Sequence, residues 1–181
     1  MPHSVEAQVQ AKPWYDIFRD VLKANDVRLI TYVPDNVLRP LIDAIDADPF
    51  FEAFGVTREE EGLGIISGAW MGGMRGALLM QTSGFATLPN VLASLCVAFQ
   101  IPALLVVSER GTLGEFNVGQ AMVCRTMRPV LECLGVEHHV CTRLDELEFI
   151  VDRTIKQAVS TQAPATLILS PLLTGGKAVK L

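Results

Sequence analysis

Three consecutive glutamates, Glu59, Glu60 and Glu61, precede an apolar, glycine-rich segment of the sequence. Two interpretations of this triplet are open. In the first, Thr57 and Glu60 form a capping box, in which each side chain accepts a hydrogen bond from the other residue's backbone amide, and the acidic residues also interact favourably with the helix dipole. In the second, one carboxylate is needed inside the molecule, where a desolvated acid can hold or transfer a proton.

The glycines that follow have the spacing of one helix face. Gly64, Gly68 and Gly72 recur every four residues, and Glu60 begins the same series. Glycine in a helix interior costs about 1 kcal/mol relative to alanine, so three in register indicate that another backbone or a flat ligand comes close to this face. Glu60 would lie at the edge of that approach, whereas its two neighbours are rotated by about 100° to either side.

The elements that must position these residues follow from the hydrophobic pattern. Short segments that are apolar throughout alternate with segments of helical period, which predicts an α/β fold: a doubly wound, mainly parallel six-stranded sheet with helices on both faces. The predicted strands span 27–33, 50–56, 76–81, 102–108, 136–142 and 164–170. The predicted helices span 14–26, 36–48, 58–74, 88–100, 120–135 and 144–161, the fifth of them interrupted near Pro129. We expect one domain over residues 13–172, with an N-terminal extension (1–12) and a C-terminal tail (173–181).

Sites in open α/β sheets lie at the carboxyl ends of the strands. Three polar loops follow predicted strands there, at residues 34–36, 81–90 and 108–120. Common nucleotide and hydrolase motifs are absent: no G-x-G-x-x-G follows the first strand, and the chain has no G-x-x-x-x-G-K-[ST], G-x-S-x-G or H-E-x-x-H. Dinucleotide binding, P-loop chemistry and serine hydrolysis therefore lose their usual support.

Taken in order, "YVPDNVLRPLI", "REEEGLGIISGAWMGG" and "LLMQTSGFATLPNVLASLCVAFQIPALLVVSERGTLGE" resemble the pyrimidine-binding domain of thiamine diphosphate enzymes. The likeness is in particular to sulfopyruvate decarboxylase alpha subunits and phosphonopyruvate decarboxylases, and it runs from about Val27 to Ser170. In that family a catalytic glutamate stands ten residues before an aromatic residue of a small-residue helix, and counting back from Trp70 gives Glu60. The resemblance implies that the Glu60 carboxylate hydrogen-bonds nitrogen N1′ of the cofactor's aminopyrimidine, which promotes removal of the C2 proton.

The loop at 81–90 corresponds to a family segment that reads like Q-N-S-G-L-G-N. Thr82, Ala86 and Thr87 depart from that pattern, which puts the substrate in doubt more than the cofactor. An ordinary strand-to-helix turn at residues 83–84 is the structural alternative. Besides Glu60, the resemblance implies these cofactor-binding residues: Pro34, Gln81, Ser83, Gly84 and Asn90.

Other loop residues are implied to bind the substrate. The guanidinium fork of Arg110 matches an anionic tail such as a sulfonate or phosphonate, and its alternative is a surface ion pair with Glu109 or Glu115. Asn36 could contact the substrate's carboxylate or carbonyl, or it could cap the helix that follows it. The implied substrate-binding set is Asn36, Arg110 and Gln120, with Arg125 a weaker candidate.

A complete enzyme of this family also needs a second domain, whose G-D-G…N motif binds Mg²⁺ and the diphosphate. The chain contains no G-D-G. The resemblance therefore implies that this chain is an alpha subunit. Its beta partner would bind Mg²⁺ and the diphosphate group of thiamine diphosphate. The implied reaction is decarboxylation of a 2-oxo acid with an anionic tail, such as 3-sulfopyruvate or phosphonopyruvate, to an aldehyde and CO₂. A carboligating subunit resembling acetolactate synthase and a non-catalytic α/β binding or regulatory module are the alternatives.

The composition of the 181 residues narrows the remaining classes of function. Half of the residues are hydrophobic, and the mean hydropathy is +0.34, which indicates a large buried sheet, a sizeable subunit interface, or both. The net charge is −5 and no basic stripe occurs, which argues against nucleic acid as a partner. No apolar run reaches the roughly 18 residues of a membrane span, and the N-terminal segment lacks the order of a signal peptide. We expect a cytoplasmic protein.

The cysteines and histidines give no sign of a metal site. Cys96, Cys124, Cys133 and Cys141 have no C-x-x-C spacing, and we expect buried free thiols. The histidine pair at 138–139 is expected on a strand, at the surface or at the sheet edge.

Overall fold

The computed structural model describes residues 12–177. Its strands form one sheet in the order β2-β1-β3-β4-β6-β5, and every neighbouring pair is parallel. The strands are β1 (Val27–Tyr32), β2 (Glu52–Gly55), β3 (Arg75–Gln81), β4 (Leu104–Ser108), β5 (Glu137–Cys141) and β6 (Ala165–Leu169). The predicted six-stranded α/β fold is confirmed, and the sheet is parallel throughout.

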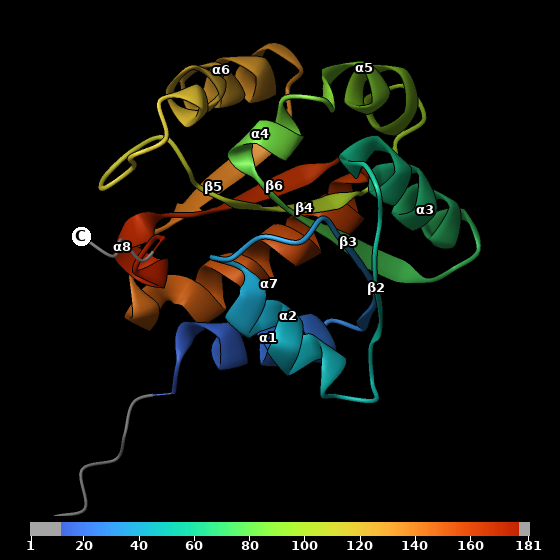
Figure 1. Cartoon of the computed structure of the whole chain (residues 1–181). Coiled ribbons are helices and arrows are strands. Elements are labelled where there is room, and N and C mark those ends of the chain that lie inside the picture. Colours follow the sequence, from blue (N-terminus) through green and yellow to red (C-terminus); the bar gives the residue numbers. More distant parts are fainter. Residues whose placement is uncertain (1–11, 178–181) are drawn as a thin grey trace, which may run out of the picture.

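Helices cover both faces of this sheet (Figure 1). One layer consists of α1 (Trp14–Ala24), α2 (Arg39–Asp46) and α7 (Leu144–Thr161). The other consists of α3 (Glu59–Met71), α4 (Thr82–Phe85), α5 (Pro89–Val91), the π-helical turn η1 (Leu92–Val97) and α6 (Gly119–Cys133). Side chains of a strand alternate between the layers: Ala77 and Leu79 of β3 pack with α1 and α2, whereas Leu78 and Met80 pack with α3 and α6. Burial on both faces explains why the strands are apolar throughout.

The helices differ from the sequence prediction in four places. The predicted helix 88–100 is divided into the short α5 and the π-helical η1. Helix α6 continues through Pro129, where an interruption was expected. Pro129 is exposed, as is Arg125 one turn earlier, so water can satisfy the carbonyl that loses its partner. The predicted loop at 81–90 contains the short helix α4, and a further short helix, α8 (Pro171–Thr174), lies across the predicted domain boundary at residue 172.

The chain reverses direction across the sheet between β1 and β3. After β1 it enters α2 in one layer, and after β3 it enters α4 in the other layer. Such a reversal opens a crevice at the carboxyl ends of the two strands. The start of α3 follows the carboxyl end of β2 and lies at the same edge. The fold therefore brings residues 34–36, 57–61 and 81–90 to one edge of the sheet.

Three further expectations concern the cysteines, the histidines and membrane-spanning helices. Cys96, Cys124 and Cys141 are buried free thiols as predicted, but Cys133 is exposed near the end of α6. His138 and His139 lie on β5, an edge strand, as expected. Over residues 12–177, no helix combines the length and the apolar content that crossing a membrane requires.

Candidate functional site

The three glutamates at the start of α3 have three different environments. Glu61 Oε2 accepts the backbone N–H of Thr57 at 3.0 Å, so Glu61 rather than Glu60 satisfies this end of the helix. The Glu59 carboxylate lies against Gly84, where a Cβ would come within 2.0 Å of Glu59 Oε1. Glu60 is half-buried, and its Oε2 is fully buried without a hydrogen-bond partner among residues 12–177. The proposed capping box between Thr57 and Glu60 does not form.

The isolated oxygen of Glu60 is the clearest sign of a binding site in this region. A buried acceptor without a partner costs about 1–3 kcal/mol, and more for a charged group, so native proteins rarely keep one without a function. A donor from outside the chain would satisfy it. The protonated ring nitrogen of a pyrimidine is such a donor, and the Glu60 side chain therefore fits the cofactor that the sequence resemblance implies.

The glycine face of α3 is open. Gly64 and Gly68 are exposed, and a Cβ built on either would meet nothing within 4 Å. Gly72 follows the last helical residue and serves as the C-cap. Met71 on the same helix is 72% exposed. The glycine spacing predicted a close approach to this face of α3. No contact among residues 12–177 provides that approach.

Helix α3 lies beside η1, which also has exposed apolar side chains near its end. Ser67 contacts Cys96 of η1 at 3.7 Å, which places the two helices side by side. Val97 at the end of η1 is 41% exposed, and Phe99 just after it is 71% exposed. We call the exposed part of α3 together with these two residues the α3–η1 face: Gly64, Gly68, Met71, Val97 and Phe99.

A hydrogen-bonded network joins the carboxyl ends of β1, β3 and β4. Ser108 Oγ donates to Asp35 Oδ1 at 3.0 Å. Thr82 Oγ1 donates to the Ser108 carbonyl at 3.2 Å and accepts the Arg110 backbone N–H at 2.8 Å. Asp35 Oδ1 also accepts the backbone N–H groups of residues 37 and 38. Asp35 therefore makes the turn before α2, and Asn36 does not cap the helix.

Arg110 is buried and paired with two carboxylates. Its Nε and Nη2 donate to Glu115 Oε2 and Oε1 at 2.6 and 2.9 Å, and its Nη1 lies 3.9 Å from Asp35 Oδ2. The hydrogen bond to Glu115 raises the pKa of Arg110. The reciprocal bond, with further bonds from backbone amides, lowers the pKa of Glu115 from 4.5 to about 2. Both groups are charged at neutral pH. The alternative of an ion pair with Glu115 is present in the structure, and the pair is buried rather than on the surface.

Two glutamines meet beside this network. Gln120 in the first turn of α6 is 9% exposed, and its Nε2 donates to Gln81 Oε1 at 3.2 Å. The remaining oxygen, Gln120 Oε1, is buried without a partner. As with Glu60, the unsatisfied atom marks a place where an external donor would bind.

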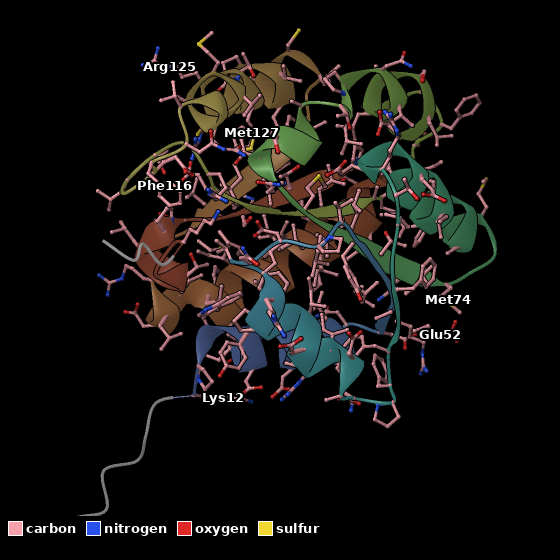
Figure 2. All side chains as sticks on the ribbon, viewed as in Figure 1. Lys12, Glu52, Met74, Phe116, Arg125 and Met127 are labelled. Atoms are coloured by element: carbon pink, nitrogen blue, oxygen red, sulfur yellow. The ribbon has the colours of Figure 1, made fainter. Side chains whose placement is uncertain are left out.

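The other predicted site residues lie around this edge with fewer contacts. Gly84 is buried and Ser83 half-buried in α4, whereas Pro34 and Asn90 are exposed. Asn36 is exposed and lines a groove between α1 and α2. Arg125 projects from the outer side of α6 (Figure 2) and is not among the residues brought together.

Sequence reasoning gave Asp35 and Thr82 no role of their own, although both connect the strand ends. The signal was present: Thr82 comes directly after an apolar strand and Asp35 within three residues of one, where side chains commonly bond to neighbouring loops. Within the described part of the chain, no group of three or more His, Cys, Asp or Glu side chains could hold a metal ion.

No family model matches the chain. It is 44% identical over 104 residues to the alpha subunit of sulfopyruvate decarboxylase from Methanothermobacter thermautotrophicus, which covers 58% of this chain and 63% of that subunit. It is 38% identical over 113 residues to the corresponding subunit from Methanocaldococcus jannaschii, covering 62% and 67%. Phosphonopyruvate decarboxylase from Streptomyces viridochromogenes is 37% identical over 89 residues, covering 49% of this chain and 22% of that protein.

The fold has a counterpart among solved structures. 2-Oxoglutarate:ferredoxin oxidoreductase from Magnetococcus marinus superposes with a TM-score of 0.71 over 90% of this chain and 29% of that one. The sequence identity is 11%, so this likeness concerns the fold alone. The two sulfopyruvate decarboxylase subunits show more than a shared fold, because they are 44% and 38% identical to this chain over more than 100 residues. The chain belongs to the sulfopyruvate decarboxylase alpha-subunit family of thiamine diphosphate-dependent decarboxylases.

Proposed function

We propose that the chain is the pyrimidine-binding alpha subunit of a thiamine diphosphate-dependent decarboxylase. Its substrate would be a 2-oxo acid with an anionic tail, such as 3-sulfopyruvate or phosphonopyruvate, and its products an aldehyde and CO₂. The observation that carries this proposal is the buried, unpartnered Oε2 of Glu60. It lies at the position where the family's catalytic glutamate is expected, and the relatives named above are decarboxylases of such acids.

Glu60 would act on the cofactor through a single hydrogen bond. When bound, thiamine diphosphate supplies a nucleophilic carbon and an electron sink for decarboxylation. Glu60 Oε2 would accept a hydrogen bond from the proton-bearing N1′ of the pyrimidine, and the burial of this oxygen keeps away the water that would otherwise compete for that bond. The remaining residues proposed to line the cofactor are Pro34, Gln81, Ser83, Gly84 and Asn90.

The substrate would lie beside the ends of β1 and β4. We assign the anionic tail to Arg110, whose guanidinium already holds a carboxylate in a two-bond arrangement. Gln120 would donate to the acid through its amide Nε2, which now donates to Gln81, and Asn36 would contact the carboxylate or carbonyl of the acid. Arg110 must then share or exchange its present partner, Glu115.

A beta subunit would complete the site. We propose that it carries the diphosphate and Mg²⁺ and that it packs on the α3–η1 face, which exposes glycines and apolar side chains next to Glu60. Apolar, small-residue surfaces of this kind are typical of permanent subunit interfaces. The cofactor would then bridge two polypeptides.

Titration and reconstitution test this proposal. Thiamine diphosphate titrated into the purified chain should give little heat and no turnover. Addition of the co-expressed beta subunit and Mg²⁺ should restore binding, with release of CO₂ from 3-sulfopyruvate. Tight cofactor binding and turnover by the chain alone would contradict the two-subunit assignment. Acetolactate formation from pyruvate by the assembly, without aldehyde, would identify a carboligase instead.

A further inference from the structure

The loop between β4 and α6 folds around one of its own carboxylates. Glu115 Oε1 accepts the backbone N–H groups of Phe116 and Asn117 at 3.1 and 2.9 Å, and Oε2 accepts that of Gly111 at 3.3 Å. Two of these donors are the residues directly after Glu115, so they travel with it if the loop moves. The contacts that tie the carboxylate to the body of the protein are its pair of hydrogen bonds with Arg110 and the longer bond from Gly111.

Arg110, in contrast, is anchored. Its backbone N–H is bonded to Thr82 at the end of β3, and its side chain, 7% exposed, lies between Asp35 and Glu115. The Nε and Nη2 atoms contact the two oxygens of one carboxylate, which is the fork geometry that guanidinium also uses for phosphonate and sulfonate oxygens. Exchanging one such anion for another would keep the number and type of hydrogen bonds to Arg110.

The loop has the features of a segment that can be displaced. Gly114 has φ +75° and open space where a Cβ would lie, whereas Gly111, with φ +91°, is held against the Gln120 carbonyl and fixes the other end. Leu113 and Val118 are mainly exposed. Phe116, on the loop before α6 in Figure 2, has an exposed cation–π contact with Lys177. Few buried apolar contacts therefore hold residues 112–118 in place.

A small cavity with room for about one water adjoins the pair, so an incoming anion needs the loop to move. Its lining includes Arg110, Glu115, Glu109 and Lys177, and therefore carries a second cation and a second carboxylate. We propose that Glu115 is a specificity-determining residue that occupies the guanidinium fork of Arg110 in the absence of substrate and is exchanged for the anionic tail of the 2-oxo acid. Acids without a second anionic group, such as pyruvate, cannot make this exchange. This inference rests on the proposed function, because it takes Arg110 as the tail-binding residue.

Sulfoacetate, which carries a sulfonate and a carboxylate but no oxo group, is the probe. Calorimetric titration is carried out on the assembly of the full chain with its beta subunit. Glu115→Gln removes the competing charge, so its Kd for sulfoacetate should fall by about tenfold, the effect of weakening one charged hydrogen-bonded partner. Glu146→Gln is the control: it breaks another Glu–Arg pair, with Arg143 at 3.7 Å, whose residues neither contact Arg110 nor line this cavity. It should leave the Kd unchanged.

Hydrogen exchange on the wild-type assembly gives a second readout that needs no variant. Saturating sulfoacetate should speed amide exchange in the peptide covering residues 111–118, because the loop is released. Equal or weaker binding by Glu115→Gln, no binding to the wild type, or slower exchange in this peptide would each overturn the inference. These readouts do not depend on turnover. If the assembly decarboxylates 3-sulfopyruvate but gives any of these contrary results, the proposed function stands and the exchange of Glu115 for the substrate's anionic tail is wrong. If sulfoacetate releases the loop in an assembly that has no decarboxylase activity, the exchange at Arg110 stands and the proposed function fails.

Discussion

The backbone amide of Thr57 donates to Glu61 Oε2 at 3.0 Å, and this contact leaves Glu60 free of the helix end. The capping function and the buried carboxylate therefore belong to different residues of one triplet. Since glutamine has nearly the same size as glutamate and no charge, single replacements within the triplet can separate the two roles.

If Glu60 holds the proton at N1′ as proposed, Glu60→Gln should lower kcat by about a hundredfold or more in the assembled, cofactor-saturated enzyme. Its melting temperature without cofactor should be unchanged or raised, since an unpartnered buried carboxylate oxygen destabilises the fold. Steady-state kinetics and thermal unfolding measure the two effects.

Glu61→Gln and Glu59→Gln are the controls for that measurement. Glu61→Gln should lower the free energy of unfolding by about 0.5–1 kcal/mol through loss of the charged cap, with little change in kcat. If all three variants have similar rates and Glu60→Gln is the least stable, the triplet serves the helix end alone.

Gly64→Ala and Gly68→Ala should each stabilise the isolated chain by about 0.5–1 kcal/mol, because alanine favours the helix and its Cβ meets nothing in the chain. The same variants should weaken association with the beta subunit if it packs on the α3–η1 face. Gly62→Ala is the matched control on the same helix: its Cβ would lie 2.7 Å from Leu78 Cδ1 and should destabilise the chain. Chemical denaturation and analytical ultracentrifugation measure both properties, and unimpaired assembly would exclude this face.

Arg110→Ala should raise KM for 3-sulfopyruvate strongly and for pyruvate far less, since only the first acid presents a tail to the guanidinium. It would also leave Asp35 and Glu115 buried without a cation, which is destabilising. Arg110→Lys keeps the charge and loses the fork, and it should still raise KM for 3-sulfopyruvate by about tenfold. Equal losses on both acids would identify a purely structural arginine.

The Arg110–Glu115 pair should give a defined acid dependence of stability. Glu115 has its pKa lowered from 4.5 to about 2, so its contribution is present above 4.5 and is lost as the pH falls towards 2. Arg110 stays charged throughout, and Asp35 is the other carboxylate facing it. The difference in unfolding free energy between wild type and Glu115→Gln should therefore be full at neutral pH and smaller at about pH 3. Urea unfolding measures it, and a difference independent of pH would show that the charge of Glu115 does not stabilise the fold.

Sequence alone determined where the strands and most of the helices lie along the chain. The reason is that a parallel sheet buried on both faces needs strands that are apolar throughout, a local pattern visible in segments such as 76–81 and 164–170. The family resemblance proposed Glu60 as the catalytic glutamate, and this could be read locally because the motif of fixed spacing lies within a single helix.

Tertiary structure decided which side chains pair across loops. The local sequence suggested Asn36 as a helix cap and an ion pair of Arg110 with Glu115. It did not show that Asp35 would make the turn before α2, or that Arg110 would be buried between Asp35 and Glu115. Asp35 also bonds to Ser108, 73 residues away in the sequence. That bond depends on the order of strands in the sheet, because β3 separates β1 from β4 and the loop after β1 crosses the carboxyl end of β3 to reach β4.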